Sequence, residues 1–134
     1  MLVKRRVIIK AVVTEKFKKQ LISRLEQALQ EVKRTQQQIE TQGTRYLAEL
    51  EGRDPTQAVA FAKKLERQKR KQEAVRARLD EELSKVRMLE LGAEHPQGTV
   101  EGLVEINIGD NINEKLCATE VIVEDGFVKE IRNP

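Results

Sequence analysis

Residues 15–50 constrain the fold more than any other part of the chain, because they contain no proline and one glycine, Gly43. Apolar side chains recur there at alternating steps of four and three residues, which keep one stripe of a helix facing a partner helix. The stripe consists of Leu21, Leu25, Ala28, Val32, Ile39 and Tyr46. Four further apolar residues lie beside it: Ile22, Leu29, Leu47 and Leu50. The added width indicates contact with more than one partner helix.

The segment EGRDPT predicts a turn between two helices. Gly52 can end the first helix, Asp54 can cap the second, and Pro55 is tolerated in a first helical turn. The apolar periodicity resumes after this turn and stops again at a glycine. We therefore predict two long helices, over residues 15–51 and 55–91.

The apolar positions of the two helices match each other in an antiparallel hairpin. A chain that folds back at residue 52 brings together positions whose numbers add to about 104. The predicted facing pairs are Leu65 with Ile39, Leu79 with Leu25, Leu83 with Leu21, and Ala58 with Tyr46. Since apolar residues meet along the hairpin, we predict an antiparallel two-helix coiled coil, with each helix roughly 54 Å long.

Both ends of the chain show the two-residue alternation of β-strands. In residues 2–13, Val3, Val7 and Ile9 share one parity, and most of the basic residues have the other. Residues 99–132 alternate as well, and Asp125-Gly126 between two apolar runs is a strong signal for a β-hairpin. We therefore predict three antiparallel strands over residues 99–132, with the strand of residues 2–13 as the fourth.

The predicted fold class is α+β in a single domain of residues 1–134. It combines a long antiparallel two-helix coiled-coil hairpin with a small antiparallel β-sheet, which the N-terminal strand and the C-terminal strands form. Aromatic residues make up 3% of the chain and charged residues 35%. This composition fits long exposed helices better than a large globular core.

The N-terminal RRVIIKAVVTEKFKKQL and the C-terminal VEINIGDNINEKLCATEVIVEDGFVKEIRN together resemble the YlqD-like family of small bacterial proteins. The resemblance spans the whole chain, and its matching elements are an IGDN turn and an EDGFVKEI hairpin. The resemblance implies no assigned activity and no catalytic residues. Genes of this family often lie near genes for ribosome maturation factors, which implies an RNA-linked role.

The sequence shows no catalytic, cofactor or metal site. His95 is the only histidine and is expected in a surface loop, whereas a zinc site needs further His or Cys ligands at fixed spacing. We expect the only cysteine, Cys117, to be a buried apolar side chain rather than a nucleophile. The segment GDNINE lacks the ligand spacing of a calcium loop and predicts a plain turn. We therefore expect no enzymatic activity, no cofactor and no small-molecule substrate.

The location of the protein is expected to be cytoplasmic. A single cysteine excludes an intrachain disulfide and favours a reducing compartment. The apolar run near the N-terminus is interrupted by Lys10 and is shorter than the ~20 residues that a spanning helix needs. We expect no membrane as a partner.

The segment KKLERQKRKQEAVRAR of the second helix contains eight basic and two acidic residues, and helical geometry divides the basic ones into two groups. With Leu65 placed at 0°, six cations fall between about 140° and 260°, opposite the predicted seam. These are Lys63, Lys64, Arg67, Arg70, Lys71 and Arg78, called the outer stripe below. Three polar residues fall within about 40° of the seam direction instead. These are Lys69, Gln72 and Arg76, called the polar seam below.

The two groups support different hypotheses. Polar residues in a helical seam specify register or oligomeric state, and with the wide apolar stripe they indicate a homo-oligomer. We therefore expect a binding or scaffolding protein that self-associates. Alternatively, the outer stripe binds the backbone of a structured RNA or a ribosomal component, because no aromatic residue interleaves it for base stacking. The ordinary alternative is a solvated outer face of a coiled coil.

Overall fold

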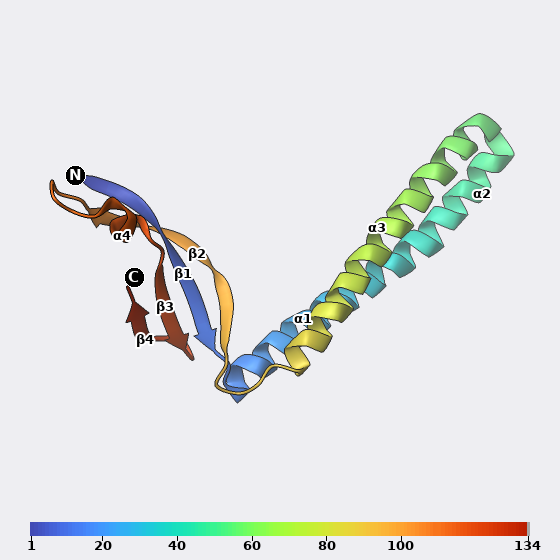
Figure 1. Cartoon of the computed structure of the whole chain (residues 1–134). Helices are drawn as coiled ribbons and strands as arrows, with labels where there is room; N and C mark the ends of the chain where they lie inside the picture. Colours follow the sequence, from blue (N-terminus) through green and yellow to red (C-terminus); the bar gives the residue numbers. More distant parts are fainter. Residues whose placement is uncertain (134) are drawn as a thin grey trace. The chain divides into compact units, whose positions relative to one another are not determined.

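The computed structural model describes residues 1–133 and shows an α+β fold in two compact units (Figure 1). One unit contains residues 1–20 and the part of the chain after Met88, and it holds a β-sheet. The other unit contains residues 21–88 and is helical apart from the turn at Asp54 and its last residue, Met88.

The sheet has four strands in the order β2-β1-β3-β4. Their bounds are β1 Leu2–Val12, β2 Glu94–Glu105, β3 Thr119–Glu124 and β4 Phe127–Arg132. β1 pairs antiparallel with β2, but it pairs parallel with β3. The prediction of an entirely antiparallel sheet is therefore wrong. Alternation specifies which face a side chain lies on, and it carries no information on the direction of a neighbouring strand.

The parallel pairing depends on the connection from β2 to β3, which passes from one side of β1 to the other. The segment GDNINE belongs to this connection, and it contains the start of a short helix, α4 (Ile112–Leu116), rather than a plain turn. The Asn111 side chain accepts hydrogen bonds from the backbone N–H groups of Asn113 and Glu114 and so caps this helix. An asparagine at this position satisfies amides that a helix start leaves free.

The hairpin predicted at Asp125-Gly126 is confirmed, since these two residues connect β3 to β4. Both have positive φ, 48° for Asp125 and 89° for Gly126. Two consecutive positive values are those of a type I′ turn, whose twist matches that of the flanking strands.

The two faces of the sheet differ in character, because residues paired across strands share a face. One face carries ten aliphatic residues from all four strands: Val3, Val7, Ile9, Ala11, Val100, Val104, Val121, Val123, Val128 and Ile131. We call it the apolar face. The opposite face carries ion pairs, among them Lys4 with Glu101 at 3.5 Å and Lys10 with Glu120 at 3.0 Å.

In the helical unit, α3 runs in the opposite direction alongside α1, η1 and α2 (Figure 1). The bounds are α1 Glu15–Gln38, η1 Ile39–Gly43, α2 Thr44–Arg53 and α3 Pro55–Arg87. The expected helix over residues 15–51 is thus divided by a π-helical segment, and the expected helix over residues 55–91 ends four residues early. The core consists of Leu29, Leu50, Ala58, Leu65, Leu83 and Val86.

The contacts between the helices show that the predicted facing pairs are displaced by about one helical turn. Leu65 lies against Gly43, and Phe61 lies against Tyr46 with ring centroids 4.8 Å apart. The cause is the position of the turn, because α2 continues through Gly52 and the chain reverses at Asp54. The Asp54 side chain accepts a hydrogen bond from the Gln57 N–H and caps α3, with Pro55 following in the first turn.

The π-helical segment η1 ends at Gly43, where Leu65 of the facing arm lies close to the backbone. A Cβ atom built at Gly43 would overlap the Cδ1 atom of Leu65, a side chain that is buried between the helices. Only glycine leaves room for the leucine there. π-Helical turns accommodate an extra residue inside a helix, so η1 adjusts the register of one arm at the point where the leucine enters.

Candidate functional site

The outer stripe lies on α3, a helix of 33 residues that contains no internal proline or glycine. The structure places all six of its cations, Lys63, Lys64, Arg67, Arg70, Lys71 and Arg78, in exposed positions. From first to last they extend roughly 22 Å along the helix at 1.5 Å per residue. The stripe is therefore long enough to contact several phosphate groups of a nucleic-acid backbone at once.

Most of the charge in the outer stripe is not neutralised by nearby carboxylates. Arg70 has one acidic neighbour, with its Nε atom 3.8 Å from the Glu66 carboxylate. Within residues 1–133, the other five cations have no Asp or Glu oxygen within 4.0 Å. The Nε–H group of Arg67 instead donates to the Lys63 carbonyl at 3.5 Å. Five of the six positive charges are thus available to an external anion.

The polar seam lies on the other side of α3, where Lys69, Gln72 and Arg76 are all half-buried. The Lys69 ammonium forms an ion pair with Glu40 at 2.9 Å, and Arg76 donates to the Gln36 side-chain carbonyl at 3.3 Å. The predicted register, in which facing positions add to about 104, places residues 35 and 28 opposite Lys69 and Arg76 instead. Lys69 and Arg76 thus have polar partners on the facing arm that the predicted register did not indicate.

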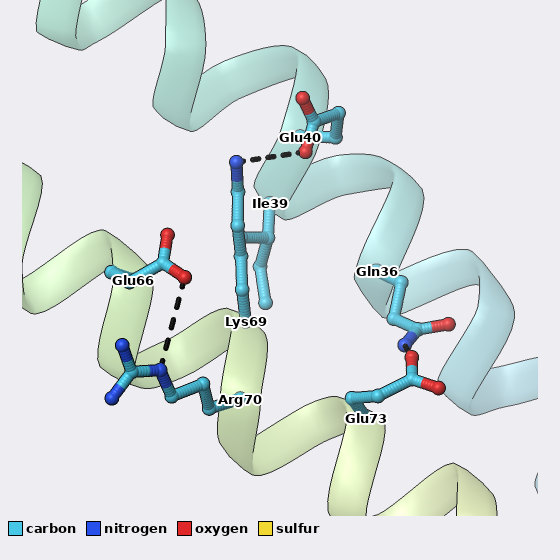
Figure 2. A pocket seen from close by; sticks show the side chains of 7 residues that line it. All are labelled: Gln36, Ile39, Glu40, Glu66, Lys69, Arg70 and Glu73. Carbon is cyan, nitrogen blue, oxygen red and sulfur yellow. Dashed lines mark hydrogen bonds and ion pairs between the residues drawn. The ribbon is translucent and has the colours of Figure 1, made fainter.

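A cavity of about 360 Å³ opens beside the polar seam (Figure 2). It is lined by Gln36, Ile39, Glu40, Glu66, Lys69, Arg70 and Glu73. Each of its three carboxylates already has a partner within the cavity: Lys69 for Glu40, Arg70 for Glu66, and the Gln36 amide for Glu73. The charges here satisfy one another, so the cavity belongs to the packing of the polar seam rather than to a ligand site.

His95 and Cys117 were considered above as possible metal-binding or catalytic residues, and the structure differs from the expected position of the first and the expected burial of the second. His95 lies in β2, not in a loop, and its ring lies 5.9 Å from the ring of Phe17. Cys117 is exposed and free, which corrects the expectation of a buried apolar side chain. Within residues 1–133, no group of three or more His, Cys, Asp and Glu side chains could hold a metal ion. In the same part of the chain, no helix is both long and apolar enough to cross a membrane.

The charged face of the sheet holds a cluster that the sequence did not indicate. The Arg132 guanidinium donates two hydrogen bonds to Glu94 and lies 3.6 Å from Glu120, which in turn pairs with Lys10. Hydrogen bonds from Arg132 hold the pKa of Glu94 below its usual value, and the same contact raises the pKa of Arg132. The cluster ties β4 to β2 across two intervening strands and so stabilises the sheet.

The apolar face is the largest feature that sequence reasoning missed as a candidate site. Of its ten aliphatic residues only Ala11 is buried, and Val100, Val128 and Ile131 are each more than half exposed. The signal was the alternation itself, because a strand with one apolar face shows this pattern whatever covers that face.

These observations define a class of small α+β proteins that contain a mixed four-stranded sheet and several helices, one of which carries an exposed row of cations. The sequence profile of the YlqD protein family matches residues 1–132, and the chain belongs to this family.

Two relatives show the extent of the likeness. The chain is 30% identical over 127 residues to the uncharacterized protein YlqD of Bacillus subtilis (strain 168), which covers 95% of this chain and 94% of that protein. It also superposes on the crystal structure of a protein of unknown function from Synechococcus sp. WH 8102 with a TM-score of 0.84. That match has 22% sequence identity and covers 99% of this chain and 95% of the other, so it shows a shared fold.

Proposed function

We propose that this chain is a non-enzymatic binding and scaffolding protein that self-associates in the cytoplasm, with its helical unit packed as an antiparallel coiled-coil hairpin. The observation that carries the proposal is the exposed apolar face of the sheet. Monomeric proteins rarely expose a contiguous apolar surface of this kind unless it binds something. Self-association covers that surface and presents several helical hairpins from one assembly.

Light scattering coupled to size-exclusion chromatography tests the proposal. The chain has a mass of 15.4 kDa, so a self-associated form has at least twice that mass. The mass is to be measured over a range of protein concentrations, because an association governed by mass action shifts with concentration. A mass of one chain throughout the micromolar range would refute self-association.

A second candidate function rests on the outer stripe, whose five unpaired cations favour a structured RNA or a ribosomal component as partner. Binding through the phosphate backbone releases counterions, so the affinity falls steeply with salt. For six phosphate contacts to a duplex, the affinity is expected to fall about 10³-fold between 50 and 200 mM salt. Lys and Arg without aromatic neighbours read the backbone and shape of a nucleic acid rather than its bases.

The test compares two triple variants in binding to a structured RNA at two salt concentrations. Arg67→Glu, Arg70→Glu and Lys71→Glu together reverse three charges of the outer stripe. The matched control reverses three exposed cations of α1, namely Arg24, Lys33 and Arg34. We expect the outer-stripe variant to lose binding and the control to retain most of it. Equal losses in both variants would show that net charge alone holds the RNA, and the absence of wild-type binding would remove this candidate.

A further inference from the structure

The apolar face of the sheet has the character of an interior surface. Two rows of paired residues cross all four strands, namely Gly98, Ile9, Val121 and Ile131, and His95, Ala11, Val123 and Val128. Among the rows of this face, only the one that contains Arg5 holds a Lys, Arg, Asp or Glu side chain. The opposite face carries ion pairs, with Leu103 and Phe127 as exposed apolar side chains among them. In a layered protein, such a sheet is covered on its apolar side by another layer.

We propose that the covering layer is the sheet of a second copy of this chain, packed face to face about a two-fold axis. This inference rests on the self-association proposed above and names the surface that mediates it. A two-fold interface places the same surface patch of both subunits in contact. Two twisted sheets that pack in this way lie about 10 Å apart with their strands roughly aligned.

Charge and area both favour a second copy as the partner. This face has no carboxylates and one cation, Arg5, and its other polar side chains in the paired rows are Thr119 and His95. It therefore offers few groups that a charged peptide or nucleic acid could recognise. Strands of this length, at about 3.3 Å per residue and 4.8 Å between strands, give a face of about 500 Å². Two copies thus bury about 1,000 Å², which is the area at which specific interfaces begin.

The distribution of large and small residues selects the direction of the axis. Within the first row named above, the outer position on β2 is Gly98 and the outer position on β4 is Ile131, which protrudes. An axis parallel to the strands places β4 of one copy over β2 of the other. Ile131 of each copy then lies over the hollow at the partner's Gly98. Facing large and small side chains let two layers interdigitate without voids.

The first test places a charge on the apolar face where the isolated chain tolerates it. Val128→Glu and Ile131→Glu change side chains that are more than half exposed, so the fold of one chain is retained and circular dichroism verifies it. The matched controls are Leu103→Glu on the opposite face and Val59→Glu on α3, which are exposed to a similar extent. Burying an unpaired carboxylate is expected to raise the dimer dissociation constant at least about 100-fold.

The readout is the mass in solution. Val128→Glu and Ile131→Glu are expected to halve the mass of the wild-type assembly, while Leu103→Glu and Val59→Glu leave it unchanged. A self-associated wild type whose mass survives both apolar-face variants would overturn this inference and leave self-association standing. A monomeric wild type would instead refute the function proposed above.

The second test examines the axis. Copies that carry Val100→Lys and copies that carry Ile131→Glu are each expected to be monomeric. With the axis parallel to the strands, Val100 on β2 and Ile131 on β4 come from neighbouring rows and approach each other across the interface. Mixing the two variants is therefore expected to restore a dimer through a lysine–glutamate pair. Failure of the mixture to associate, with the wild type dimeric, would overturn this direction of the axis.

Discussion

Gly43→Ala tests whether η1 is set by the close approach of Leu65. A Cβ atom at position 43 would overlap Leu65 Cδ1 and would lie 3.3 Å from Cδ2. Forcing a carbon into a packed site costs about 1–3 kcal/mol, whereas alanine in place of glycine inside a helix gains about 1 kcal/mol. We therefore expect the free energy of unfolding to fall by about 1 kcal/mol, as measured by urea titration followed by circular dichroism.

The matched control is Gly52→Ala, also in a helix but with no atom within 4 Å of the added Cβ. There the propensity gain is unopposed, so we expect the free energy of unfolding to rise by about 0.5–1 kcal/mol. Leu65→Ala alone is expected to cost about 2–5 kcal/mol. Combined with Gly43→Ala it is expected to cost less than the sum, because the new methyl group enters the vacated space. Equal stabilisation by both glycine substitutions, or strict additivity in the double variant, would refute the packing argument.

Asp54→Ala removes the side chain that accepts from the Gln57 N–H, and we expect a loss of about 1 kcal/mol in the same urea titration. Glu94→Gln tests the contact between Glu94 and Arg132. Because this contact lowers the pKa of Glu94, it stabilises the fold at neutral pH, and the stabilisation is lost as the pH falls through that pKa. The difference in urea midpoint between wild type and Glu94→Gln is therefore expected to vanish in acid, and a constant difference would contradict this. Gly126→Ala forces a side chain to a φ of 89°, and we expect a loss of about 1–2 kcal/mol and a lower melting temperature.

The sequence carried more information on the elements of the fold than on their pairing. The alternation of residues 2–13 corresponds to β1, and Asp125-Gly126 has the backbone geometry that this dipeptide favours. The parallel neighbour of β1 could not be predicted, because it depends on the path of the connection through α4. Side-chain parity is the same for either strand direction.

The register between the two helical arms is a second feature that the sequence did not predict correctly. Gly52 and Asp54 are both plausible ends of a helix, and choosing the glycine displaced the predicted partners of Leu65 and Tyr46 by about one turn. The interruption at η1 has no signature in the periodicity, and it ends where Gly43 lies close to the distant Leu65.

Part of the candidate site could likewise be predicted from the sequence, and part of it could not. Helical geometry separated the outer stripe from the polar seam, and the structure places Arg67 on the exposed side and Arg76 on the half-buried side. The partners of the polar seam depended on the displaced register, and so they could not be predicted. The exposure of the apolar face could not be predicted either, because a sequence does not show whether a second layer covers a sheet.

The central place of β1 in the sheet has a consequence for how the chain folds during synthesis. Val7 pairs with Val100 on one side and with Thr119 on the other. β1 therefore stays unpaired until more than 90 further residues have been synthesised. At about 5–20 residues per second, that delay is roughly 5–20 s. The helical unit closes on itself in the meantime, because its contacts are local around Asp54. β1, with aliphatic side chains and two unpaired edges, is therefore the segment of the nascent chain most in need of a chaperone.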